Sequence, residues 1–248
     1  MGYRTGLVSV SFRKHTPEEI LRAMKAAGLS CIEWGSDVHA PADNLENLKY
    51  LVALGEKYGI TCCSYGSYFH AGQHSEEEIY PYIRAARILG TNIIRIWCGS
   101  KNSEEYTALE KEALFASCKK LAQIAEQENV VLCMECHNWT YTNRLAGALE
   151  LMKTVNSAHF QMYWQPNQWR SLEENLEYAE KMAAHTHVIH AFNWEEDKKF
   201  PLCGAVAVWK DYLKKFDASQ CILLEFMPDD KIESLGVEAE ALQKIVEG

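Results

Sequence analysis

Residues 6–35 read GLVSVSFRKHTPEEILRAMKAAGLSCIEWG, and this stretch decides the fold. Residues 6–12 are rich in β-forming side chains, and so are residues 31–35. Between them, Thr16-Pro17-Glu18-Glu19 combines a helix cap, a first-turn proline and a capping-box glutamate. Gly28 follows the helical pattern, at a point where positive φ ends a helix at little cost. The stretch therefore predicts a strand, a helix and a second strand.

The same unit recurs along the whole chain. Gly59 and Gly90 again stand between a helical pattern and a strand, and Ser75 with Glu78 repeats the capping box, as does Ser171 with Glu174. The expected strands, whose starts lie roughly thirty residues apart, are residues 6–12, 31–35, 60–66, 92–98, 130–136, 159–165, 186–192 and 221–226.

Strands separated by single helices pair in parallel, so the alternatives are an open doubly wound sheet and a closed barrel. An open dinucleotide-binding sheet would carry G-x-G-x-x-G after its first strand, whereas SFRKHTPEE at residues 11–19 contains no glycine. Eight even repeats favour an α/β fold of the (β/α)8 TIM barrel type. No Pro/Gly/Ser-rich linker divides the sequence, so we expect one domain over residues 1–248.

Composition excludes several classes of protein. The chain has 48% hydrophobic and 24% charged residues, which is ordinary for a globular domain. A formal net charge of −9 opposes binding to nucleic acid. The amino terminus lacks a secretory pattern and no apolar run is long enough to span a membrane, so a cytoplasmic location is expected. Nine cysteines, most of them in apolar runs, are expected to be reduced thiols that pack as small hydrophobes.

Candidate catalytic groups lie where expected strands end, which in a barrel of this kind is the catalytic face. Glu135 follows the apolar run VVLCM, and Glu225 follows CILL. His190 lies in the seventh strand. A carboxylate in such surroundings needs a compensating partner. The alternative interpretation is structural: each glutamate pairs with a nearby cation, and His190 is a core histidine.

With these residues, the sequence resembles the xylose-isomerase-like TIM barrels, a group that includes ketose 3-epimerases, hydroxypyruvate isomerases, inosose dehydratases and endonuclease IV enzymes. In its sugar epimerases a divalent metal is held by glutamates ending strands five and eight, an aspartate ending strand six and a histidine on strand seven. The resemblance assigns Glu135, His190 and Glu225 to three of these positions. Gln165 stands where the family has the aspartate.

Gln165 can bind a metal through its amide oxygen but contributes no charge, so weaker binding of Mn²⁺, Mg²⁺, Zn²⁺ or Co²⁺ is expected than in those relatives. Further side chains at the same face are expected to contact the substrate. These are Glu33, which stands beside Trp34 on the second strand, and His70, His137, Asn138 and Trp164. The C-x-x-C pair formed by Cys133 and Cys136 is set aside, because strand residues three apart face opposite sides.

The resemblance implies a metal-assisted isomerase or epimerase of a sugar or sugar phosphate, with Glu135 and Glu225 moving a proton next to a carbonyl through an enediolate. An inosose-type dehydratase and a sugar-binding barrel without catalysis remain as alternatives, the second because of Gln165. A repair endonuclease would need a basic surface and a three-metal cluster. Relatives often form dimers or tetramers, so a homo-oligomer is left open, although no segment marks an interface.

Overall fold

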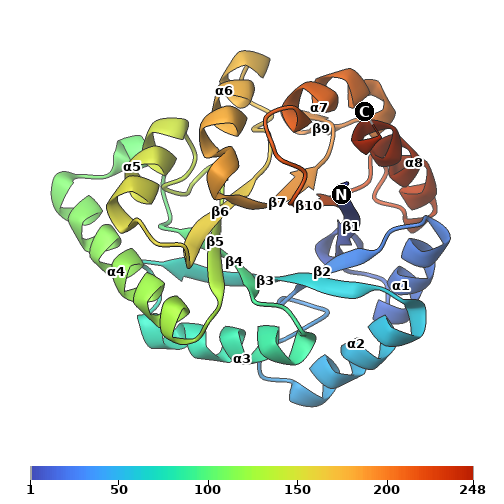
Figure 1. Ribbon diagram of the computed structural model, residues 1–248, viewed down its shortest axis with the longest axis horizontal. Coiled ribbons are helices and arrows are strands. Elements are labelled where there is room, and N and C mark those ends of the chain that lie inside the picture. The colour runs from blue at the N-terminus through green and yellow to red at the C-terminus, as the bar shows by residue number, and fades with distance from the viewer. Residues whose placement is uncertain (1, 248) are drawn as a thin grey trace.

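Eight parallel strands close into a barrel in the computed structural model, which describes residues 2–247 (Figure 1). The order around the barrel is β1-β10-β7-β6-β5-β4-β3-β2, and the first and last members of this order also pair. The barrel strands are β1 (Arg4–Val8), β2 (Cys31–Gly35), β3 (Thr61–Ala71), β4 (Ile93–Cys98), β5 (Val131–Glu135), β6 (Phe160–Trp164), β7 (Thr186–Ala191) and β10 (Cys221–Leu224). The predicted (β/α)8 barrel is confirmed.

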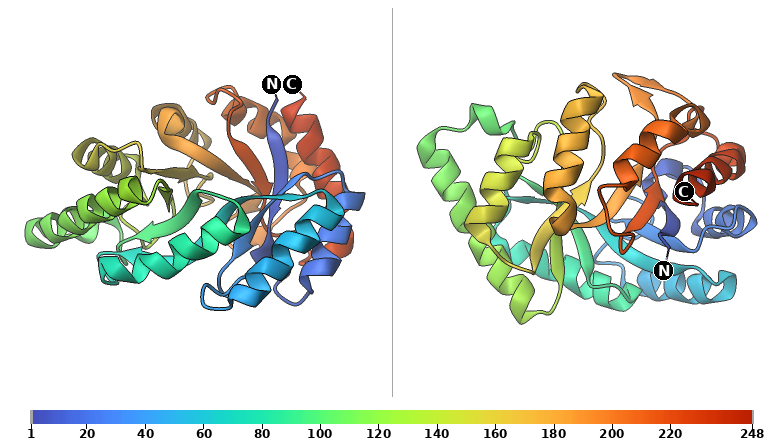
Figure 2. Two further views of the ribbon diagram at one scale, coloured as in Figure 1. Left: turned by 60° about the horizontal axis from the view of Figure 1, so that its bottom comes forward. Right: turned by 45° about the horizontal axis from the view of Figure 1, so that its top comes forward.

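Helices surround the sheet on its outer side, and α8 lies beside α1 so that the ring of helices also closes (Figures 1 and 2). The α-helices are α1 (Pro17–Ala26), α2 (Leu45–Tyr58), α3 (Tyr80–Leu89), α4 (Ala108–Gln127), α5 (Leu145–Val155), α6 (Leu172–Met182), α7 (Val206–Leu213) and α8 (Leu235–Val246). Within residues 2–247, none of these helices combines the length and the apolar character needed to cross a membrane.

Helix ends follow the predicted local signals. Thr16 accepts the backbone N–H of Glu19 while the Glu19 side chain accepts that of Thr16, so the capping box of α1 forms as expected. Gly59 and Gly90 have φ of 69° and 80°, the left-handed conformation in which an L side chain is strained. Local residue choice therefore sets where these helices end.

Two strands differ from prediction. The first strand was expected to reach residue 12, but residues 9–12 form the 3-10 helix η1. There Ser9 Oγ accepts the N–H of Gly35, and Ser11 Oγ accepts that of Phe226. These serines satisfy neighbouring chain ends instead of extending the ladder. The third strand runs on to Ala71, so His70 lies in β3 and not in the loop after it.

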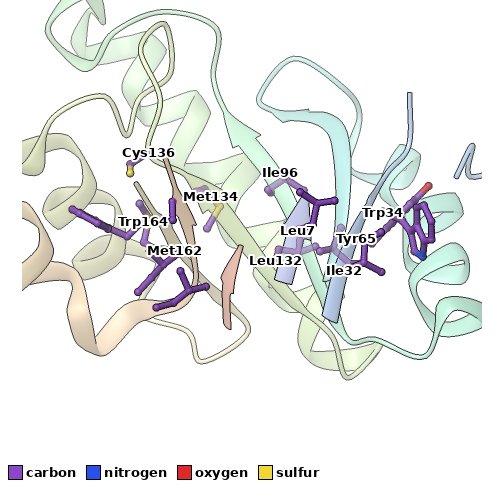
Figure 3. Packing of buried hydrophobic residues seen from close by; sticks show 14 of the residues in the cluster. Leu7, Ile32, Trp34, Tyr65, Ile96, Leu132, Met134, Cys136, Met162 and Trp164 are labelled. Carbon is purple, nitrogen blue, oxygen red and sulfur yellow. The ribbon is translucent and has the colours of Figure 1, made fainter. Parts of the chain in front are cut away.

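Two separate apolar layers result from the alternation of side chains along the strands. The larger layer lies between the sheet and the helices, and Figure 3 shows part of it, including Leu7, Ile32 and Trp164. The smaller layer fills the inside of the barrel. Its buried members are Val8, Val10, Cys31, Cys63, Cys133, Tyr163, Val188, Cys221 and Leu223. A short antiparallel hairpin, β8 (Trp194–Glu195) with β9 (Lys198–Lys199), stands at the edge of the molecule (Figure 2).

Candidate active site

A pocket of about 280 Å³ opens at the carboxyl ends of the strands, where the loops after β5, β6, β7 and β10 meet. Its volume is near the lower end of the range for small-molecule sites, about 300–1,000 Å³. Polar groups and aromatic rings both line it. The lining includes Arg95, Glu135, His137, Asn138, Gln165 and Glu225 together with Tyr68, Trp97, Trp169, Phe192, Trp194 and Phe226. A small polar ligand with apolar faces suits such a lining.

Three oxygen atoms surround one ring nitrogen at this pocket. His190 Nδ1 lies 3.2 Å from Gln165 Oε1, 3.4 Å from Glu135 Oε1 and 3.5 Å from Glu225 Oε2. His190 is 1% exposed, so these groups meet away from bulk water. The structure thus brings together the four residues that the sequence proposes as metal ligands. Two carboxylates, an amide oxygen and an imidazole are a donor set that suits Mg²⁺, Mn²⁺, Co²⁺ or Zn²⁺.

Arg95 of β4 organises the acids beside this point. Its Nη1 donates to Glu135 Oε2 at 2.6 Å, and its Nε donates to Glu33 Oε1 at 3.2 Å. Trp97 Nε1 also donates to Glu135 Oε2, at 2.5 Å. One oxygen of Glu135 is therefore fully bonded to the protein, while its Oε1 faces His190.

These contacts decide the ionisation of the buried groups. Burial raises the pKa of Glu135, but Arg95 and His190 outweigh it and hold that pKa well below its ordinary value. Burial likewise lowers the pKa of His190, but Glu225 and the hydrogen bonds to the other acids raise it well above its usual range. With no cation bound, the imidazolium supplies positive charge among the carboxylates. A divalent metal would supply that charge instead and bind the neutral ring.

Glu225 has fewer partners than Glu135. Among the described residues, its only ion-pair contact is His190, and its side chain is 12% exposed towards the pocket. Phe226, the next residue, has φ of 56°, which is uncommon for a bulky side chain. Strained backbone of this kind is often found at functional sites, where it re-aims a chain end. Here it turns the chain directly after Glu225.

Two of the predicted substrate contacts lie in the pocket. His137 and Asn138 line it, and the His137 ring stacks on Trp97 at 5.7 Å between centroids. Asn138 Oδ1 accepts a hydrogen bond from Asn167 Nδ2 at 2.7 Å, which joins the loops after β5 and β6. Both side chains are placed to contact a ligand.

The other three predicted contacts do not line the pocket. Trp164 is 1% exposed and packs on Trp209, Tyr212 and Phe216 on the helix side of the sheet, because it alternates with Tyr163 and Gln165. Glu33 lies fully buried beneath the pocket, where Ser64 and Arg95 bind it. His70 lies behind Trp97, and its Nδ1 contacts the carbonyl oxygen of Gly99 at 2.8 Å.

Sequence reasoning missed Arg95 and Trp97. The signal was present, because an arginine within the otherwise apolar NIIRIWC needs a buried acid as partner, just as Glu135 needs a cation. Period-two alternation also places Arg95 and Trp97 on the same face of β4. Only the closed barrel shows that this face points at Glu135.

The fold and the site define a class of protein, a (β/α)8 barrel with a carboxylate and histidine cluster at its carboxyl face. The family model described as xylose isomerase-like TIM barrel matches residues 21–246. The chain belongs to this family. No curated protein sequence gives a match to it.

Solved structures of this fold cover nearly the whole chain. A probable 3-DHS dehydratase, AsbF, from Bacillus anthracis has a TM-score of 0.82 at 16% identity, covering 98% of this chain and 99% of its own. D-psicose 3-epimerase from Clostridium cellulolyticum H10, solved with D-tagatose, has a TM-score of 0.71 at 13% identity, with 98% of each chain covered. A xylose isomerase-like TIM barrel protein from Mycobacterium smegmatis in complex with magnesium has a TM-score of 0.71 at 13% identity, covering 99% and 96%. At these identities the likeness shows the fold alone.

Proposed function

We propose that this protein is a metal-assisted isomerase or epimerase that moves a proton next to the carbonyl of a sugar or sugar phosphate. The observation that carries the proposal is the meeting of Glu135, Gln165 and Glu225 oxygens within 3.2–3.5 Å of His190 Nδ1 at the pocket. Sugar epimerases and a magnesium-bound protein among the structures of the same fold support it.

Glu135, Gln165, His190 and Glu225 would hold the metal. When bound, a divalent metal polarises a carbonyl oxygen and stabilises the negative charge that develops as the neighbouring carbon loses its proton. Arg95 keeps Glu135 ionised and fixes its orientation, so that Oε1 stays free for a ligand. Gln165 brings no charge, so the site carries one negative charge fewer than a set with three carboxylates.

The two glutamates are not equivalent as bases. Glu135 Oε2 accepts hydrogen bonds from Arg95 and Trp97, and its pKa is held well below the ordinary value, so it is a weak proton acceptor. Glu225 has no such donors and reaches the pocket. We therefore assign the removal of the substrate proton to Glu225, with Glu135 as its weaker counterpart on the opposite side.

The same asymmetry favours a second candidate, a dehydratase. Inversion of a carbon centre needs two groups that exchange protons on opposite faces, whereas loss of water from the neighbouring carbon needs only one base at the acidic C–H bond. A site with one free glutamate suits the second reaction. The fold neighbour titled a probable 3-DHS dehydratase is consistent with it.

A solvent-exchange experiment tests the proposal. The metal-loaded protein is incubated in D₂O with a panel of ketoses, ketose phosphates and cyclic polyhydroxy ketones, and deuterium at the carbon next to the carbonyl is followed by NMR and mass spectrometry. We expect exchange with at least one compound, slowed by about 10²–10⁴-fold in Glu225→Gln. Glu195→Gln, in the exposed β8 hairpin, is the matched control and should exchange at the wild-type rate.

The products separate the candidates. A stereoisomer or an aldose marks an epimerase or isomerase, and a product lighter by one water marks a dehydratase. Sugar binding without exchange would contradict catalysis and leave a ligand-binding barrel. Exchange that Glu225→Gln does not slow would contradict the assignment of the base.

A further inference from the structure

A second cluster of metal-ligating side chains lies inside the barrel at the opposite, amino end. Cys31, Cys63 and Cys221 place their Sγ atoms within 4.8 Å of one another. Cys31 and Cys221 are the first residues of β2 and β10, and Cys63 lies near the start of β3. The chain brings three thiols from three strands to one point, and the proposed reaction uses none of them.

Backbone spacing explains why these side chains meet. Cys31 lies two residues before Glu33, so both face the inside of the barrel, with the thiol nearer the amino end. Strand β1 separates β2 from β10, and opposite Cys31 it carries Gly6. A Cβ atom at Gly6 would lie 2.7 Å from Cys31 Sγ and 2.0 Å from the Cys31 carbonyl oxygen. The glycine therefore leaves room for the cluster.

The spacing of the sulfurs suits a three-coordinate cation. With metal–sulfur bonds of about 2.3 Å, three sulfurs in a trigonal plane lie about 4.0 Å apart. That separation is within the 4.8 Å limit found here, so only small side-chain shifts are needed. Thiolates select soft cations such as Cu⁺ over Mg²⁺ or Mn²⁺. A tetrahedral Zn²⁺ site would need a fourth ligand, and no fourth acidic, histidine or cysteine side chain joins the trio among residues 2–247.

Charge and access also favour cation binding. Hydrogen bonds from Cys31 and Cys63 lower the pKa of Cys221, so one sulfur of the trio is primed as a thiolate. Arg4 adds positive charge nearby, and its Nη2 donates to Thr61 Oγ1 at 2.6 Å across the start of β2. Cys221 is 8% exposed and Cys63 is 6% exposed, which leaves a narrow approach from the amino end.

We propose that Cys31, Cys63 and Cys221 form a three-coordinate site for a soft, thiophilic monovalent cation of the Cu⁺ class. Binding forms three metal–sulfur bonds, and the protons of the S–H groups present are released to the solvent. No atom changes oxidation state. The site is separate from the carboxyl face, since Cys221 and Glu225 are four residues apart on one strand, roughly 13 Å along it.

The test is an anaerobic titration of the reduced full-length protein with Cu⁺ held by a chromophoric chelator. We expect one Cu⁺ per chain, accompanied by a near-ultraviolet sulfur-to-copper charge-transfer band. Cys31→Ser, Cys63→Ser and Cys221→Ser should each weaken the site more than about 100-fold, beyond the 10–100-fold typical of losing an outer-shell partner. Cys133→Ser, in the same interior layer, is the matched control and should keep wild-type affinity.

Alkylation of the wild-type protein gives a second readout that does not depend on the folding of any variant. Cu⁺ should slow the iodoacetamide labelling of Cys221, measured by mass spectrometry, and leave that of the exposed Cys203 unchanged. Glu135→Gln should keep Cu⁺ binding, which separates this site from the carboxylate cluster. Absence of competitive Cu⁺ uptake, uptake that survives loss of any of the three thiols, or equal protection of Cys203 would overturn the proposal and leave the thiols as packing groups.

Discussion

Arg95 is the residue on which the interior of the site depends. It is 4% exposed and bridges two buried acids, Glu33 and Glu135. Replacing a buried ion pair by apolar groups can be neutral, but removing one partner leaves an unpaired buried charge. Arg95 therefore stabilises the fold only together with its acids, and its loss exposes their full desolvation cost.

Arg95→Met should lower the free energy of unfolding by about 3–5 kcal/mol at pH 7, measured by urea denaturation. Arg87→Met is the control, because Arg87 pairs with Glu128 on the surface and its side chain is 54% exposed. That variant should lie within about 0.5 kcal/mol of wild type. Equal losses in the two variants would contradict a special role for Arg95.

The pH dependence gives the sign of the same effect. In wild type the pKa values of Glu33 and Glu135 are depressed, so their contribution to stability is present above the ordinary value of 4.5 and is lost as the pH falls below it. Without Arg95, burial dominates and raises these pKa values, so the variant loses stability as the pH rises through them. The difference in unfolding free energy between wild type and Arg95→Met should therefore narrow from pH 7 to pH 5.

Elements form where local sequence and tertiary packing agree. The strand and helix order, the capping box at Thr16 and the glycine helix ends were predictable, because each rests on neighbouring residues. The end of β1 was not, because Ser9 and Ser11 bond to residues far away in the chain. Trp164 was misplaced for a related reason: a strand end was known, but the face that points to α7 was not applied to it.

Glycine substitutions test the account of helix ends. Gly90 has φ of 80° with open space around its Cβ position, so Gly90→Ala meets only conformational strain, about 1–2 kcal/mol. Gly236 lies inside α8 with equally open space and no positive φ, so Gly236→Ala should stabilise by up to about 1 kcal/mol. Thermal or urea unfolding measures both. Changes of the same sign would contradict the backbone assignments.

At the scale of the whole molecule, closure of the barrel collects the functional groups. Glu135, His190 and Glu225 lie on strands that are neighbours or next neighbours in the barrel order β10-β7-β6-β5. The three ligand types were predictable from strand ends and from the family resemblance. The bridging of Glu33 and Glu135 by Arg95 was not, because it depends on β2, β4 and β5 facing one another across the closed interior.

The two ends of the barrel should behave independently. Cys221→Ala and Glu135→Gln change groups on different strands, at the amino and carboxyl ends of the barrel interior. Their effects on the unfolding free energy should add within about 0.5 kcal/mol in the double variant. A larger interaction energy would mean that the thiol cluster and the carboxylate site are coupled through the interior layer.

The central claim is that a divalent metal binds at the carboxyl face through Glu135, Gln165, His190 and Glu225. The most direct measurement is a calorimetric titration of chelator-treated protein with Mn²⁺. We predict one site per chain, at least tenfold weaker in Glu225→Gln, tighter in Gln165→Asp because a charge is added, and unchanged in Glu195→Gln. Absence of Mn²⁺, Mg²⁺, Co²⁺ and Zn²⁺ binding to wild type, or equal affinity in all variants, would contradict the account.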